Sequence, residues 1–95
     1  MQIEYFAMLR QATGKSQEQW NKPEATLGDL LRDLSALYGQ GFRRWLYDGD
    51  KLSEIAIIMV NGRDVRHLSK FDTPLHPDDT VVIFPPVAGG SAIVV

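Results

Sequence analysis

The chain has 95 residues, of which 44% are hydrophobic and 23% charged, and its formal net charge is −2. This size and composition are typical of one soluble globular domain, and the scattered basic residues of a slightly acidic chain argue against a nucleic-acid partner. The absence of cysteine excludes a disulfide framework, a thiolate metal site and a cysteine nucleophile. Neither a leader peptide nor an apolar run of about 18 residues occurs, so we expect a cytoplasmic protein without a membrane span.

Residues 2–10 alternate between two faces, which is the pattern of a β-strand. One face carries Ile3, Tyr5, Ala7 and Leu9, and the other carries Gln2, Glu4, Phe6, Met8 and Arg10. We predict a strand over residues 2–10 whose first face enters the core. The apolar Phe6 and Met8 on the second face leave two explanations open: another element covers them, or they bind a partner protein.

A weaker strand over residues 15–20 follows a turn at Gly14, and the two strands are predicted to pair as a hairpin. Residues 26–29, TLGD, fit a helix-capping box. Leucines then recur at helical spacing, which predicts an amphipathic helix over residues 27–38 that ends at Gly39. We expect this helix to lie across the sheet with its apolar stripe in the core.

Two further elements are predicted between this helix and the middle of the chain. Residues 42–47 fit a single helical turn with Trp45 and Leu46 facing inward. Residues 54–60 form the most apolar strand, and because apolar residues fall on both of its faces we expect a central or well-covered position.

The C-terminal part of the fold begins with a tight turn. Asn61-Gly62 is a strong hairpin signal, since both residues tolerate positive φ, so residues 63–65 are predicted to return as a short strand. The last strand covers residues 80–84, with Val81 and Ile83 on one face and Val82 and Phe84 on the other.

The chain shows no residue set that is typical of a metal site or an enzyme. His67 and His76 lack a third ligand, and the acidic turn at Asp48 and Asp50 lacks the remaining ligands of a calcium loop. No Ser/His/Asp set is apparent, so we expect a protein that binds no metal and catalyses nothing by itself.

The order of predicted elements indicates an α+β fold, with strands that form a sheet and one main helix packed across it. If the last strand lies beside the first, Phe6, Met8, Val82 and Phe84 share one exposed apolar patch with Arg10 at its rim. Such a patch would be a candidate surface for binding a partner.

Two prolines and then two glycines follow the last strand. Pro85 and Pro86 fix φ and lack an N–H donor, so the strand stops there and the chain leaves stiffly. Gly89 and Gly90 lack a Cβ and can thread a narrow channel. A terminal glycine carboxylate becomes reactive when an activating enzyme converts it to an acyl-adenylate, from which a sulfur nucleophile displaces AMP and leaves a thiocarboxylate.

Residues 83–90, IFPPVAGG, resemble the ending of the small subunit of molybdopterin synthase, a ubiquitin-like β-grasp sulfur carrier. The resemblance extends to FAxxR at residues 6–10, VNG at residues 60–62, and PLxxDDxVV at residues 74–82. It therefore covers residues 1–90 in order, although residues 20–53 are similar only in pattern. It implies a β-grasp domain over residues 1–90, with a mixed sheet of four to five strands and one main helix across it.

The resemblance also implies a mechanism. An enzyme of the ubiquitin-activating type would use ATP to adenylate Gly90, which would then become a thiocarboxylate, so the carrier itself would bind no cofactor. The tail from Pro85 to Gly90 would enter the large subunit of molybdopterin synthase, where sulfur passes to a pterin precursor. The family's docking face is apolar and includes the positions of Phe6 and Phe84.

The sequence departs from this family after Gly90, because an apolar extension at residues 91–95, SAIVV, follows it. An amide at Gly90 cannot be adenylated. Three interpretations are open: a zinc metalloprotease trims a precursor, the chain is a divergent binding or regulatory module, or the extension is an artefact of the sequence. In the second case the extension itself would make contacts, including self-association.

The sequence also leaves the sulfur acceptor open. Carriers for thiamine and cysteine synthesis are similar, although the PPVxGG ending favours the pterin. The choice between molybdenum and tungsten and the oligomeric state are not determined.

Overall fold

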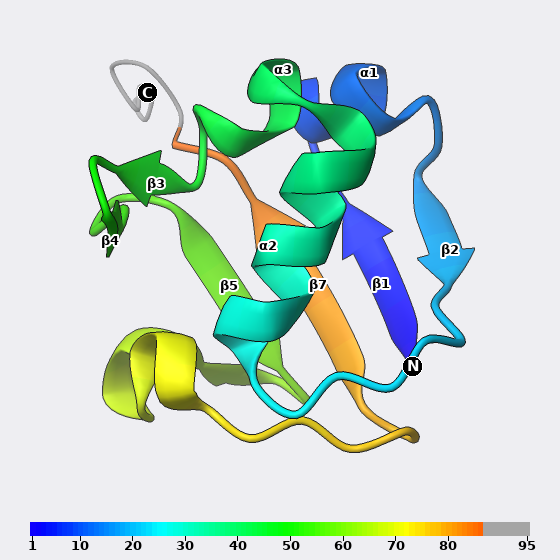
Figure 1. Cartoon of the computed structure of the whole chain (residues 1–95), viewed down its shortest axis with the longest axis vertical. Coiled ribbons are helices and arrows are strands. Elements are labelled where there is room, and N and C mark those ends of the chain that lie inside the picture. Colours follow the sequence, from blue (N-terminus) through cyan, green and yellow to red (C-terminus); the bar gives the residue numbers. More distant parts are fainter. Residues whose placement is uncertain (87–95) are drawn as a thin grey trace.

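A five-stranded mixed sheet forms one layer of the protein, and the helix α2 (Leu27–Tyr38) packs across it (Figure 1). The computed structural model describes residues 1–86. In spatial order the strands are β2 (Gln17–Gln19), β1 (Gln2–Tyr5), β7 (Thr80–Phe84), β5 (Ile57–Val60) and β6 (Arg63–Asp64). The other elements are α1 (Met8–Thr13), α3 (Gln40–Arg43), the hairpin β3 (Tyr47–Asp48) with β4 (Lys51–Leu52), and the short 3-10 helices η1 (Val65–His67) and η2 (Lys70–Asp72).

Strand β7 occupies the centre of the sheet. It runs parallel to β1, with Ile83 beside Tyr5, and antiparallel to β5, with Phe84 beside Ile57. The two outer strands pair antiparallel, β2 with β1 and β6 with β5. The predicted pairing of the first two strands is thus confirmed, but helix α1 lies between them, so they do not form a hairpin. The expectation that the last strand lies beside the first is therefore confirmed, as is the mixed sheet with one main helix across it.

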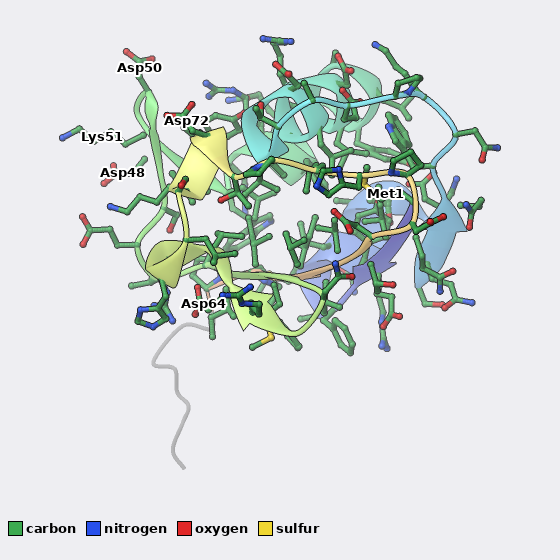
Figure 2. The ribbon with its side chains drawn as sticks, turned by 90° about the horizontal axis from the view of Figure 1, so that it is seen from below. Met1, Asp48, Asp50, Lys51, Asp64 and Asp72 are labelled. Atoms are coloured by element: carbon green, nitrogen blue, oxygen red, sulfur yellow. The ribbon has the colours of Figure 1, made fainter. Side chains whose placement is uncertain are left out.

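The core fills the space between α2 and the sheet (Figure 2). Its members have almost no exposed surface, and they include Leu27, Leu30, Leu31 and Leu34 from α2 and Ile3, Tyr5, Ile58, Val81 and Ile83 from the strands. Burying one such leucine side chain contributes about 1.5–3 kcal/mol. The predicted amphipathic helix is thus confirmed, and its leucine stripe holds it to the sheet.

Both ends of α2 lie where the sequence predicts them. At the start, Thr26 Oγ1 accepts a hydrogen bond from the backbone N–H of Asp29 at 3.2 Å. At the end, Gly39 has φ 79, and its N–H bonds to the carbonyl of Ser35 at 2.8 Å. A residue with a Cβ would be strained at that angle, so the glycine ends the helix.

The predicted strand over residues 2–10 is wrong beyond Tyr5. The N–H of Leu9 bonds to the carbonyl of Phe6 at 3.1 Å, and Ala7 between them has φ 53 and ψ −129. These angles are those of the second residue of a type II′ turn, where glycine is usual. Helix α1 follows and buries Leu9 from a helix instead of a strand. The apolar alternation therefore continues past the end of the strand by coincidence.

The most apolar predicted strand begins at Ile57 and not at residue 54. The hydroxyl of Ser53 accepts hydrogen bonds from the N–H groups of Ile55 and Ala56, at 3.3 Å each, and holds the preceding loop away from the sheet. The hairpin at Asn61-Gly62 is confirmed, with φ 53 and 82 at its two turn residues.

The helical turn predicted over residues 42–47 lies slightly earlier, as α3. Phe42 and Leu46 are fully buried, whereas Trp45 is only half-buried. No helix within residues 1–86 has both the length and the apolar surface that a membrane span requires.

Candidate functional site

The predicted proline neck continues directly from β7. Val81, Ile83 and Pro85 are buried, and Val82, Phe84 and Pro86 are half-buried, so the two-residue alternation extends through both prolines. The pairing with β5 ends at Phe84, because proline has no N–H to donate to a ladder. The predicted tail glycines, Gly89 and Gly90, lie outside the described residues.

Phe6 and Phe84 form one stacked aromatic pair at the point where β7 ends. Their ring centroids are 4.4 Å apart and their planes differ by 17°. The backbone fixes this arrangement, since the N–H of Phe6 donates to the carbonyl of Ile83 at 3.2 Å. The structure therefore brings together two of the predicted partner-binding residues from opposite ends of the chain.

Arg10 belongs to the same group. Its Nε donates to the carbonyl of Tyr5 at 3.0 Å, and its guanidinium carbon lies 5.1 Å from the centre of the Phe6 ring. A guanidinium over an aromatic face is attracted by the ring quadrupole. Arg10 thus holds Phe6 while its side chain stays at the surface.

Val82 lies on the same face of the sheet, between Glu4 of β1 and Met59 of β5. Met8 is 40% exposed and belongs to α1, so it is not part of the sheet face on which the sequence pattern placed it. Of the predicted partner-binding residues, the structure brings together four: Phe6, Arg10, Val82 and Phe84. Met8 lies on the adjoining helix α1 and is not part of this group.

Two outward side chains of β5 were missed by the sequence reasoning. Ile57 lies beside Phe84 and Met59 beside Val82, and both are half-buried. The sequence signal for these two side chains is that both faces of the strand are apolar. We interpreted that pattern as a central or well-covered strand and not as part of a partner-binding surface. We use the name sheet patch for Phe6, Ile57, Met59, Val82 and Phe84.

A carboxylate network fixes β1, β2 and α2 beneath this region. Glu18 Oε2 accepts hydrogen bonds from the hydroxyls of Tyr5 (2.5 Å) and Tyr38 (2.6 Å), and Lys15 lies 3.3 Å from Oε1. Burial, followed by the bond to Glu18, raises the pKa of Tyr5. Burial also opposes ionisation of Glu18, but the bonds from both tyrosines and Lys15 outweigh it and lower the pKa of Glu18.

Asn61 and Asp79 anchor the other end of β7. Asp79 Oδ1 accepts from the side chain of Asn61 at 2.8 Å, and its Oδ2 accepts from the N–H of His76 at 2.8 Å. Asn61 Oδ1 in turn accepts from the N–H of Thr80 at 2.9 Å. These bonds give a structural reason for the VNG and DD motifs, which lie far from the neck along β7.

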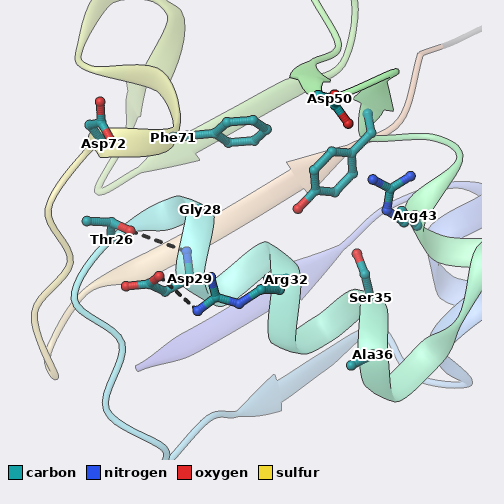
Figure 3. A pocket seen from close by; sticks show the side chains of 11 residues that line it. Thr26, Gly28, Asp29, Arg32, Ser35, Ala36, Arg43, Asp50, Phe71 and Asp72 are labelled. Carbon is teal, nitrogen blue, oxygen red and sulfur yellow. Dashed lines mark hydrogen bonds and ion pairs between the residues drawn. The ribbon is translucent and has the colours of Figure 1, made fainter.

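A pocket of about 650 Å³ opens between α2, β3 and η2 (Figure 3). Its charges are of both signs: Asp29 pairs with Arg32 at 3.0 Å, and Arg43 lies 4.2 Å from the centre of the Tyr47 ring. Within residues 1–86, no group of three His, Cys, Asp or Glu side chains could hold a metal ion. We assign no cofactor to this pocket.

Comparison with known proteins identifies the family. Residues 3–90 match the model of the ThiS family. The chain is 37% identical over 91 residues to small archaeal modifier protein 3 of Haloferax volcanii. The aligned residues cover 95% of this chain and 98% of that protein. It is also 37% identical over 86 residues to the sulfur carrier protein CysO of Mycobacterium tuberculosis, covering 87% and 90%.

Solved structures agree with this assignment. A chain of the BexX/CysO complex from Amycolatopsis orientalis superimposes with a TM-score of 0.78 at 27% identity, covering 94% of this chain and 98% of that one. A putative molybdopterin converting factor, subunit 1, from Pyrococcus furiosus superimposes with a TM-score of 0.67 at 33% identity, covering 90% and 95%. The chain belongs to the ThiS family of ubiquitin-like sulfur carriers and has their β-grasp fold.

Proposed function

We propose that this chain is the sulfur-carrying small subunit of a molybdopterin synthase, serving molybdenum or tungsten cofactor biosynthesis. The observation that carries the proposal is the stacked pair of Phe6 and Phe84 at the start of the proline neck. A partner that docks on the sheet patch would receive the tail at one fixed place and direction. The carrier contributes this placement and no catalytic group of its own.

The chemistry proceeds on Gly90 after residues 91–95 are removed. Hydrolysis of the amide between Gly90 and Ser91 frees a carboxylate. An oxygen of that carboxylate attacks the α-phosphorus of ATP on the activating enzyme, and pyrophosphate leaves. Hydrosulfide from a sulfur donor then displaces AMP from the acyl-adenylate and leaves a thiocarboxylate at Gly90. The sulfur of the thiocarboxylate forms a bond to the pterin precursor, and water cleaves the acyl–sulfur bond, which leaves the sulfur on the precursor and returns Gly90 to a carboxylate.

Two observations support this role over that of a simple binding module. The PPVxGG ending follows the sheet patch directly. A putative molybdopterin converting factor subunit is 33% identical across 90% of the chain. A chain from a complex of CysO with BexX superimposes across 94% of this chain, which supports a partner protein under either role.

A second candidate function shares the first chemical step. The match to small archaeal modifier protein 3 favours transfer of the activated Gly90 to an amine of another protein, which would displace AMP and form an amide. The two functions differ in the group that replaces AMP on Gly90. Sulfur replaces it in the first case and gives a thiocarboxylate, and a lysine amine replaces it in the second and gives an amide.

The test uses two forms of the chain, one ending at Gly90 and one ending at Val95, with the activating enzyme from the same cell. The shorter form should support exchange of pyrophosphate into ATP and, with a sulfur donor, gain a thiocarboxylate; the longer form should support neither. Sulfur transfer to a pterin precursor with the large subunit would then assign the acceptor. Absence of exchange with the shorter form would contradict the proposal.

A further inference from the structure

Two segments of the chain carry basic residues and no acidic ones. Residues 5–17 and 34–47 contain four of the ten Lys and Arg residues, and neither segment contains Asp or Glu. The rest of the chain carries the other six basic residues and all 12 acidic residues. A chain whose net charge is −2 therefore has a separate basic part, which its overall composition does not reveal.

The fold brings these two segments together at the end of the sheet from which the neck leaves. Tyr5 ends β1 beside Ile83 of β7, and its ring lies edge-on to the ring of Phe42 in α3, with 6.1 Å between the ring centroids. Helix α1 follows β1 and contacts α3, and both helices lie at the end of the sheet where β7 stops (Figure 1). The two basic segments therefore lie beside the start of the neck.

Three arginines of these segments stack on aromatic rings. The pairs, with the distance from the guanidinium carbon to the ring centroid, are Arg10 with Phe6 (5.1 Å), Arg43 with Tyr47 (4.2 Å) and Arg44 with Trp45 (4.6 Å). Within residues 1–86 the ion pairs use other basic residues, and none involves these three arginines. A stacked guanidinium still presents N–H donors at its edge, which can bind a carboxylate. We call the three arginines the basic collar.

The other basic residues without an ion pair in the described chain lie in a different setting. Lys51, Arg63 and Lys70 each lie within two residues of an aspartate, which lowers the local positive charge. No acidic residue lies within three residues of any member of the basic collar. Acidic side chains line the pocket beside Arg43, but within residues 1–86 none of them forms an ion pair with it. The basic collar therefore keeps its positive charge available to a partner.

We propose that the basic collar binds an acidic rim around the channel in which the activating enzyme takes the neck. This inference rests on the proposed function, and it commits to the activating enzyme because both candidate functions begin with adenylation of Gly90. Any protein that takes the neck approaches this end of the sheet. Complementary charges at the rim of an interface raise the rate of encounter more than they slow dissociation. The sheet patch supplies apolar contact, and the basic collar supplies speed and orientation.

The test measures association of the chain ending at Gly90 with the activating enzyme from the same cell, by stopped-flow mixing at ionic strengths of about 0.01 and 0.1 M. Over this range the screening length falls from about 30 to about 10 Å. We expect the association rate constant to fall about tenfold and the dissociation rate constant to change little. Arg44→Glu should lower the association rate constant about fivefold at the lower ionic strength and weaken its dependence on salt.

Two further variants separate the basic collar from net charge and from packing. Arg63→Glu makes the same change in net charge at an exposed residue, but at the other end of the sheet, since Arg63 pairs with Val60 and Val60 with Val81 at the start of β7. It should lower the association rate constant far less than Arg44→Glu does. Arg44→Lys keeps the charge without the planar stack on Trp45 and should retain the unsubstituted rate constant.

Three outcomes would overturn the basic collar alone. The first is an association rate constant that does not depend on ionic strength. The second is an equal effect of Arg44→Glu and Arg63→Glu, which would trace the effect to net charge. The third is an equal loss in Arg44→Lys and Arg44→Glu, which would trace it to packing on Trp45. Absence of pyrophosphate exchange with the unsubstituted chain would overturn the proposed function, and the basic collar with it.

Discussion

Replacing Glu18 by alanine should destabilise the protein strongly, because one carboxylate oxygen satisfies two tyrosines. Tyr5 has no exposed surface, so its O–H would be left buried without a partner. An unsatisfied buried donor costs about 1–3 kcal/mol, and a hydrogen bond to a charged group contributes about 1.5–3 kcal/mol. We therefore expect the free energy of unfolding to fall by about 2–4 kcal/mol.

Urea unfolding followed by circular dichroism measures this loss, and thermal unfolding gives a second readout, since 1 kcal/mol shifts the melting temperature of a domain of this size by about 4–8 °C. On a Tyr5→Phe background the loss should be smaller by about 1–2 kcal/mol, because the stranded hydroxyl is gone. Lys15→Ala, at a 45% exposed partner of the same carboxylate, should change the stability far less than Glu18→Ala, because solvent screens an exposed ion pair.

The contribution of Glu18 to the free energy of unfolding should depend on pH. The pKa of Glu18 is lowered in the folded state by hydrogen bonds from Tyr38, Tyr5 and Lys15, which outweigh the opposing effect of burial. Its contribution to stability is therefore complete above the unfolded pKa of about 4.3 and is lost as the pH falls through the folded value. The stability difference between wild type and Glu18→Gln should shrink accordingly in acid. A loss for Glu18→Ala no larger than that for Lys15→Ala, or one unchanged on the Tyr5→Phe background, would refute the reasoning.

Three further substitutions test other parts of the fold by the same unfolding measurement. Ala7→Gly should stabilise the protein by about 1 kcal/mol, since Ala7 has φ 53 in a turn that favours glycine; a loss of stability would contradict this. Glu24→Gln should stabilise the protein at neutral pH, because burial raises the pKa of Glu24 and so makes its charged form unfavourable in the folded state. The amide oxygen of glutamine can still accept the hydrogen bond from Trp20. The gain should be smaller than the loss caused by Glu18→Ala. That gain should shrink as the pH falls through the raised folded pKa of Glu24 and be lost below the unfolded value of about 4.3, and a gain that is independent of pH would count against it. Asp79→Ala should cost about 2 kcal/mol through its two lost hydrogen bonds; a neutral result would show that these bonds do not anchor β7.

The sequence predicted those elements whose local pattern and tertiary environment agree. Helix α2 has a capping threonine, a leucine stripe and a closing glycine, and β7 has strict alternation followed by two prolines. The first strand was predicted too long because Leu9 is buried whether residues 6–9 continue the strand or turn into α1. Periodicity reports which side chains are buried and not which backbone buries them.

The sheet patch shows the same limit. Alternation identified Phe6, Val82 and Phe84 as outward residues, and their meeting required only that the first and last strands pair. The contribution of β5 was not predictable, because Ile57 and Met59 alternate with equally apolar inward residues. Only the register between β5 and β7 shows which of them stand beside Phe84 and Val82.

The central claim is that Gly90 becomes the reactive end of this chain, and the intact mass of the protein isolated from its native cell tests it most directly. The account predicts a species that ends at Gly90, with a fraction in which sulfur replaces one carboxylate oxygen. A population that ends entirely at Val95, under conditions in which the cofactor is being made, would contradict it.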